Sequence, residues 1–226
     1  METDLLEGLA RPVTVLTVFP HPDDESFATG GCLALYARDP DIRCASLCLS
    51  KGGKSGALPK VGLPAEREPE VREREYMAST AILGVDRAII RDYEDQGLPT
   101  VPEEELAGSI EEVIRKEGAQ VVITYGPDGI TGHPDHITCS RLTEIAARRA
   151  GVSRLFMVSG PGWMGRVFLR QRLLRPTHAV DIRDVYKIKM LALKSHASQM
   201  LISMEPMIWV GVIMRMAGKE YFHRRL

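Results

Sequence analysis

Four of the six histidines in this chain stand in three short polar segments. The segments are His21-Pro22-Asp23-Asp24-Glu25, His133-Pro134-Asp135-His136 and His196-Ala197-Ser198-Gln199. Two neutral imidazoles and one carboxylate form a common catalytic zinc shell, with a fourth position open to water. The residue types therefore predict a metal site made by His21, Asp24 and His136.

The residues beside these candidate ligands could carry out acid–base chemistry. Zinc lowers the pKa of a bound water towards neutrality, and Asp23 could accept the proton of such a water as a general base. His133 could stabilise a tetrahedral oxyanion or protonate a leaving amine, and Asp135 could hydrogen-bond His133 and set its tautomer and pKa. Together these roles predict metal-assisted hydrolysis of an amide.

Simpler structural roles compete with these assignments. Asp23 could cap the helix that follows it, and Glu25 is a comparable candidate for that cap. His133 could be a turn residue, and His196 could hydrogen-bond the end of a helix. The combination of a His–Asp–Asp segment with a His–Asp–His segment favours the metal site, because convergent His and Asp sets are typical of such sites.

The first two segments each follow an apolar run that is typical of a buried strand. Further along the chain, strand-like and helix-like segments alternate. We expect strands over 13–19, 42–49, 87–90, 119–124, 155–158 and 179–182, and helices over 27–38, 65–83, 102–116, 137–150 and 185–196, the first of them interrupted early by Gly30-Gly31. This alternation predicts an α/β fold with a mostly parallel central sheet between two helical layers, and a site at the carboxyl ends of the strands.

The length of 226 residues suits one domain with a sizeable core. No linker divides the chain, so we expect a single domain over 1–226, with residues from about 159 onward forming a cap or rim. The apolar stretch 204–216 is too short to span a bilayer and suggests self-association or a cover over the substrate, so a homo-oligomer is possible.

Composition excludes several classes of protein. The net charge of −1 gives no electrostatic reason to bind nucleic acid or an anionic membrane. The first residues lack the basic and apolar regions of a signal peptide, and the four cysteines form no CxxC pair, so we expect a cytoplasmic protein.

These segments resemble the LmbE-like, or PIG-L, family of zinc-dependent N-acetylglucosaminide deacetylases, which includes deacetylases of mycothiol and bacillithiol synthesis. The resemblance covers nearly the whole chain. It is carried by Pro20–Ser26, Gly132–His136 and His196–Gln199, and by weaker matches at Lys51–Gly56, Arg72–Glu75, Asp95–Leu98 and Glu220–Phe222. One departure is Pro20, which stands where the family more usually has Ala.

The resemblance implies a three-layer Rossmann-like fold and zinc ligands at His21, Asp24 and His136. It also implies Asp23 as the base and His133 as the electrostatic or acid group. In addition, it implies that Arg72 and His196 contact the substrate, which would be a small N-acetylglucosamine-type conjugate. Fe²⁺, Co²⁺ or Mn²⁺ could also occupy a site with these ligands.

Three other functions remain as alternatives at this point. A zinc amidase could cleave a thiol conjugate in the same site, and a non-catalytic protein could simply bind a metal or a sugar. A nucleotide-dependent oxidoreductase is disfavoured because the first turn lacks the glycines of a dinucleotide-binding loop, and Gly53-Lys54-Ser55 does not complete a P-loop.

Overall fold

A computed structural model describes residues 1–160, 174–200 and 218–226 of the chain. Within these ranges the strands form a seven-stranded sheet in the order β3-β2-β1-β4-β5-β7-β6. The strands are β1 (Val13–Phe19), β2 (Ile42–Ser50), β3 (Arg87–Tyr93), β4 (Val121–Tyr125), β5 (Arg154–Ser159), β6 (His178–Asp181) and β7 (Lys219–Arg224). β1 to β5 are parallel, whereas β7 is antiparallel to both β5 and β6. The expected α/β class with a mostly parallel sheet is confirmed.

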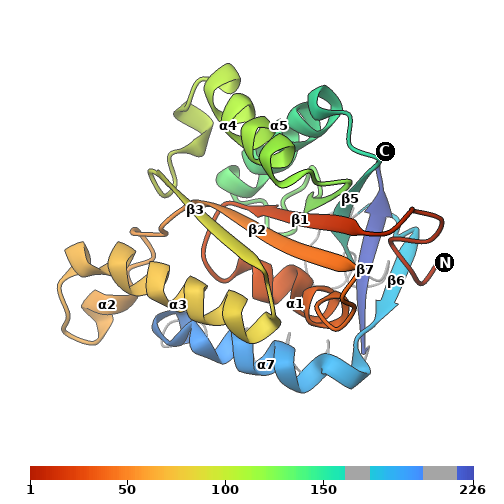
Figure 1. The fold of residues 1–226 in the computed structure, drawn as a ribbon. Helices are drawn as coiled ribbons and strands as arrows, with labels where there is room; N and C mark the ends of the chain where they lie inside the picture. The colour runs from red at the N-terminus through yellow and green to blue at the C-terminus, as the bar shows by residue number, and fades with distance from the viewer. Residues whose placement is uncertain (161–173, 201–217) are drawn as a thin grey trace.

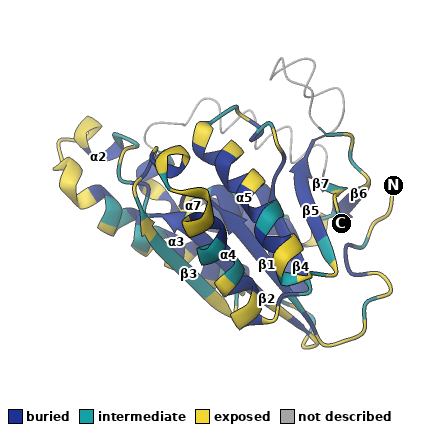
Figure 2. Cartoon of the chain, turned by 90° about the horizontal axis from the view of Figure 1, so that it is seen from above, coloured by how far each residue is buried: buried dark blue, intermediate teal, exposed yellow. Residues whose placement is uncertain are grey.

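Helices cover both faces of this sheet (Figure 1). One layer contains α1 (Asp24–Tyr36), α3 (Glu68–Leu83) and α7 (Tyr186–Ser195), and the other contains α4 (Glu103–Glu117) and α5 (Pro134–Ala150). The short helix α2 (Ala57–Lys60) lies between β2 and α3. Two apolar clusters fill the spaces between the sheet and the two layers, and the strands in the middle of the sheet are buried along their length (Figure 2).

Helix α1 is continuous, so the expected interruption at Gly30-Gly31 was wrong. The glycines instead allow close packing. A Cβ atom on Gly31 would lie 2.5 Å from the side chain of Ile182, and one on Gly30 would lie 3.3 Å from Lys189. Glycine lowers helix propensity, but burial of the helix compensates for that cost here.

A buried ion pair contacts the middle of α1. Glu220, on β7, accepts hydrogen bonds of 2.8 Å from the backbone N–H groups of both Gly31 and Cys32. Lys189, on α7, donates to Glu220 at 2.6 Å and to the carbonyl of Phe27 at 2.7 Å. Both charged side chains are almost completely buried. The pair therefore joins three segments that are far apart in the sequence.

The described residues after Ser159 contribute β6 and β7 to one edge of the sheet and α7 to one helical layer. The cap or rim expected from about residue 159, and the single domain over 1–226, stay predictions. The apolar stretch 204–216 lies outside the described residues. In the part of the chain described, no helix is long and apolar enough to cross a membrane.

Candidate metal and active site

The first two polar segments meet at the carboxyl ends of β1 and β4, which are neighbours in the sheet. The chain leaves β1 into α1 on one face and leaves β4 towards α5 on the other. Such a reversal of direction opens a crevice between the two connections, and ligands of open α/β sheets bind there. The structure therefore brings residues 21–24 and 133–136 together.

His21, Asp24 and His136 form a buried cluster whose ligand atoms all lie within 4.8 Å of one another. The Oδ2 atom of Asp24 lies 3.5 Å from Nδ1 of His21, and its Oδ1 atom lies 3.6 Å from Nε2 of His136. The three residues predicted as ligands can thus hold one ion between them.

The opposite ring nitrogens of both histidines have partners of their own. Nε2 of His21 lies 3.0 Å from Asp135 and 3.2 Å from Asp95, and Nδ1 of His136 lies 3.0 Å from the carbonyl of Gly129. Histidines that bind metals usually donate their other N–H to a carboxylate or a carbonyl, which fixes the tautomer and the ring orientation. The donor set therefore fits a divalent metal between His21 Nδ1, His136 Nε2 and Asp24.

Tyr125 supports the same cluster from β4. Its hydroxyl donates to Oδ1 of Asp24 at 2.6 Å, and its ring stacks on His136 with the centroids 4.4 Å apart and an interplanar angle of 8°. Tyr125 therefore orients two of the three candidate ligands.

A second group, made of His21, His133 and Asp135, is also close enough to hold an ion. However, Oδ2 of Asp135 accepts hydrogen bonds from His21 and from the backbone of Gln96, at 3.0 and 2.8 Å. An ion held there would compete with these bonds. The cluster with Asp24 is therefore the better metal site.

Charges around the cluster favour a cation. Burial opposes the ionisation of Asp24, but the charge of His136 and the contact with His21 lower its pKa well below the ordinary value. Burial also opposes the ionisation of Asp95, yet His21 lowers the pKa of that carboxyl to about 2. Burial lowers the pKa of His21, but hydrogen bonds to Asp135, Asp24 and Asp95 raise it more. Ionised carboxylates thus surround the histidines.

Asp23 stands at the N-terminus of α1, but its side chain makes no capping hydrogen bond. The carboxylate is 31% exposed and lies 3.3 Å from Nη2 of Arg72. Burial raises the pKa of Asp23 to about 6, against the opposing charge of Arg72. A carboxylate that is accessible, ionised at neutral pH and more basic than usual suits a general base.

His133 is the N-cap of α5, and its Nδ1 atom accepts a hydrogen bond of 3.2 Å from the backbone N–H of Asp135. Its ring centroid lies 5.0 Å from those of both His21 and His136. Burial, together with the charges of His21 and His136, lowers the pKa of His133. In the neutral ring the proton is thus on Nε2, which can donate it to a reacting group.

The carboxylate of Asp135 does not contact His133 as expected. It accepts hydrogen bonds from His21 and from the backbone N–H groups of Gln96 and Leu98, and it is fully buried. The reason is that Asp135 lies in the first turn of α5, where its side chain turns towards β1 and only its backbone reaches the N-cap. Asp135 sets the tautomer of His133 through its amide.

The two residues expected to contact substrate are buried. Arg72 is 4% exposed and donates to the carbonyls of Gly52 and Pro22 as well as to Asp23. His196 is 1% exposed and lies 2.9 Å from Glu25. Contact of either side chain with a substrate stays a prediction.

Several residues of this site are not predicted by the sequence. Asp95 belongs only to a weakly matching segment, and no motif indicates a role in binding or catalysis for Tyr125, Gly129 or Glu25. The position of Tyr125 at the end of the strand that leads to His133–His136 was the available signal.

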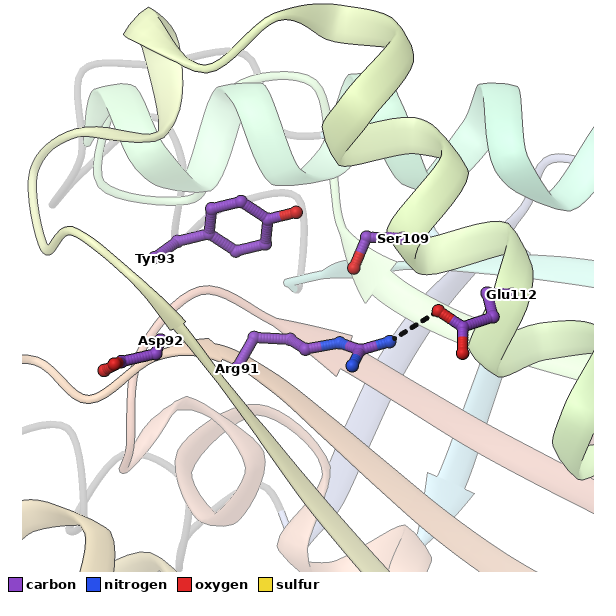
Figure 3. Close-up of a pocket in the computed structure, with 5 residues that line it drawn as sticks. All are labelled: Arg91, Asp92, Tyr93, Ser109 and Glu112. Atoms are coloured by element: carbon purple, nitrogen blue, oxygen red, sulfur yellow. Dashed lines mark hydrogen bonds and ion pairs between the residues drawn. The ribbon is translucent and has the colours of Figure 1, made fainter.

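A separate pocket of about 240 Å³ lies between β3 and α4 (Figure 3). It is lined by Arg91, Asp92, Tyr93, Ser109 and Glu112, and Arg91 donates to Glu112 across it at 3.0 Å. None of the candidate ligands or acid–base residues lines this pocket. It therefore contributes nothing to the metal site.

Comparison with known families gives a match to the model of PIG-L, described as GlcNAc-PI de-N-acetylase, over residues 16–147. That range covers more than half of the chain and contains every candidate ligand.

Two curated relatives carry the name 1D-myo-inositol 2-acetamido-2-deoxy-alpha-D-glucopyranoside deacetylase. The protein from Catenulispora acidiphila is 35% identical, and the match covers 63% of this chain and 53% of that protein. The protein from Mycobacterium sp. strain JLS is 28% identical, and the match covers 84% of this chain and 75% of that protein. The chain thus spans about half of the first relative's length and three quarters of the second's.

The fold is also similar to that of N,N'-diacetylchitobiose deacetylase from Pyrococcus horikoshii. The TM-score is 0.76 at 20% identity, and the match covers 97% of this chain and 86% of that structure. At this level of identity the similarity shows a common fold alone.

Proposed function

This chain belongs to the PIG-L family, and from that premise we propose that it is a metal-dependent deacetylase that removes the N-acetyl group from an N-acetylglucosamine-type sugar conjugate. The observation that carries the proposal is the position of Asp23. It is a partly exposed carboxylate of raised pKa, and it immediately precedes Asp24 of the cluster in the sequence. The names of the two curated relatives support the substrate class.

His21, Asp24 and His136 would hold the metal, and imidazole and carboxylate ligands favour zinc. When bound, zinc supplies Lewis-acid chemistry, which activates water and polarises a carbonyl. The buried carboxylates of Asp95 and Asp135 orient His21 for this role.

Asp23 accepts the proton of the attacking water. Its carboxylate suits this task because it stays ionised above about pH 6 and because Arg72 fixes one of its oxygens. His133 donates from Nε2, either to the oxyanion that develops on the amide carbonyl or to the departing amine. The hydrogen bond from the Asp135 amide keeps that proton on Nε2.

Non-catalytic binding of a metal or a sugar accounts less well for the site. Binding requires neither a basic, accessible Asp23 nor a His133 held in one tautomer. The thiol-conjugate amidase is not favoured either, since the curated relatives are named as sugar deacetylases.

The test is acetate release from a panel of N-acetylglucosamine conjugates, with metal-stripped protein assayed before and after zinc is added. We expect zinc-dependent release from at least one conjugate. Asp23→Asn is the matched control, because asparagine also tolerates a positive φ, and it should bind zinc without releasing acetate. Stoichiometric zinc binding with no release from any conjugate would contradict the proposed substrate class.

A further inference from the structure

The third polar segment, His196–Gln199, lies directly after α7 and contributes three side chains to a buried polar network. His196 contacts Glu25 at 2.9 Å, and Ser198 donates to Glu75 from its amide at 2.7 Å and from its hydroxyl at 2.6 Å. Gln199 donates to the hydroxyl of Ser55 at 3.0 Å. The segment therefore connects α7 with α1, with α3 and with the loop after β2.

Glu25 continues the network to the candidate base. Its Oε1 atom accepts from His196 and from Ser79, and its Oε2 atom accepts the backbone N–H of Asp23 at 3.0 Å. His196 is therefore two hydrogen bonds away from the backbone of Asp23, and one carboxylate lies between them.

The backbone of Asp23 needs such support. Its φ angle is 107°, a region that residues other than glycine rarely adopt and that the surrounding structure must hold in place. The bond from the Asp23 amide to Glu25 holds this conformation, while Arg72 holds the carboxylate.

Arg72, the other residue that holds Asp23, is also linked to the segment His196–Gln199. Arg72, which binds the Asp23 carboxylate, also donates to the carbonyl of Gly52 at 2.8 Å. Gly52 belongs to the loop after β2, in which Ser55 is held by Gln199. A Cβ atom on Gly52 would lie 2.1 Å from Nη1 of Arg72, so this approach requires glycine.

His196 itself is closed off from solvent. The side chain is 1% exposed, and Nδ1 is closed off from solvent as well as Nε2. Glu25, its partner, is equally buried.

We propose that His196 is a positioning residue, which holds Asp23 through Glu25 and does not contact the substrate. This inference rests on the proposed function insofar as Asp23 is the base. His196 would act by keeping Asp23 in place, because a displacement of about 1 Å at a catalytic group can lower the rate about 100-fold.

Two variants distinguish a positioning role of His196 from direct contact with the substrate. His196→Phe keeps the ring volume but removes the donor, whereas His196→Gln keeps an N–H that can reach Glu25. We expect His196→Phe to lower kcat about 100-fold with KM and zinc affinity unchanged, and His196→Gln to recover most of kcat. The matched control is His178→Phe, a buried histidine on β6 that contacts Glu2, which should leave kcat unchanged.

A raised KM with kcat unchanged would instead make His196 a substrate contact and overturn the proposal. Equal losses in His196→Phe and His196→Gln would overturn it too, since the donor would then be irrelevant.

A readout without substrate keeps the test independent of the proposed function. We expect the Asp23 amide to exchange with deuterium faster in zinc-loaded His196→Phe than in zinc-loaded wild-type protein, with the β1 amides unchanged. Unaltered exchange at Asp23 would refute the positioning role. If the wild-type protein releases no acetate, the proposed function fails, while the exchange measurement still decides whether His196 holds Asp23.

Discussion

The backbone N–H of Asp135 donates a hydrogen bond of 3.2 Å to Nδ1 of His133. Asp135 thereby contacts both the candidate acid–base histidine and a candidate metal ligand, because its carboxylate accepts from His21 at 3.0 Å. The same contact caps α5, so the N-terminus of this helix and the protonation of His133 depend on each other.

Substitution of His133 tests whether capping and catalysis can be separated. His133→Asn retains a good N-cap and removes the imidazole, so we expect stability close to wild type and a loss of about 10²–10⁴-fold in kcat. His133→Ala should lose the same activity and about 0.5–2 kcal/mol of stability in addition. Acetate release and urea unfolding measure the two effects, and an active His133→Asn protein would exclude His133 from proton transfer.

Tyr125→Phe removes the hydroxyl that binds Asp24 and retains the ring that stacks on His136. Loss of a partner behind a ligand typically weakens metal affinity about 10–100-fold. We expect a loss of that size in a competition titration of zinc against a chelator. The control is Tyr36→Phe, which removes another buried hydroxyl, one that contacts Leu5 and Asp4. Equal zinc affinity in both variants would contradict the role of the Tyr125 hydroxyl.

The stability provided by His196 should depend on pH. Burial lowers the pKa of His196, but the charge and hydrogen bond of Glu25, with the charges of Asp23 and Glu75, raise it above the ordinary value of 6.5. A raised folded-state pKa means that the contribution is complete below pH 6.5 and is lost as pH rises through the folded-state pKa. The difference in unfolding free energy between wild-type protein and His196→Phe should therefore shrink as pH rises. If the difference in unfolding free energy grew with pH instead, the folded-state pKa of His196 would not be raised.

Removal of one partner of the Lys189–Glu220 pair should be strongly destabilising. Glu220→Ala leaves a buried ammonium group without its carboxylate and two amides of α1 without their acceptor. We expect a cost of about 3–5 kcal/mol in chemical denaturation. Asp181→Ala is the control on β6, since Asp181 forms an exposed ion pair with Arg183, which typically contributes less than about 1 kcal/mol. Similar stability of the two variants would contradict the importance of the buried pair.

Much of the fold was predictable because the strands are apolar and regularly spaced along the chain. The run 13–19 has the same bounds as β1, and the run 42–49 ends one residue before β2 does. The three candidate ligands were predictable as well, because they lie just past the ends of two such strands and parallel strands end at the same edge.

The contacts around these residues were not predictable in the same way. Asp135 and His21 are 114 residues apart, and their bond depends on which strands become neighbours. Residue type and spacing alone had predicted that the Asp135 side chain contacts His133, two residues away. The burial of His196 was not predictable either. A polar segment after a helix has the same composition whether it is covered by a neighbouring layer or exposed to solvent.

Glu220 has a consequence for the order in which the active site becomes rigid. The carboxylate that accepts the amides of Gly31 and Cys32 follows them in the chain by 189 and 188 residues. A growing chain that has not yet reached Glu220 cannot make these bonds, and contacts so distant in sequence form slowly. The helix that carries the candidate ligand Asp24 is thus synthesised long before the residue that secures its middle.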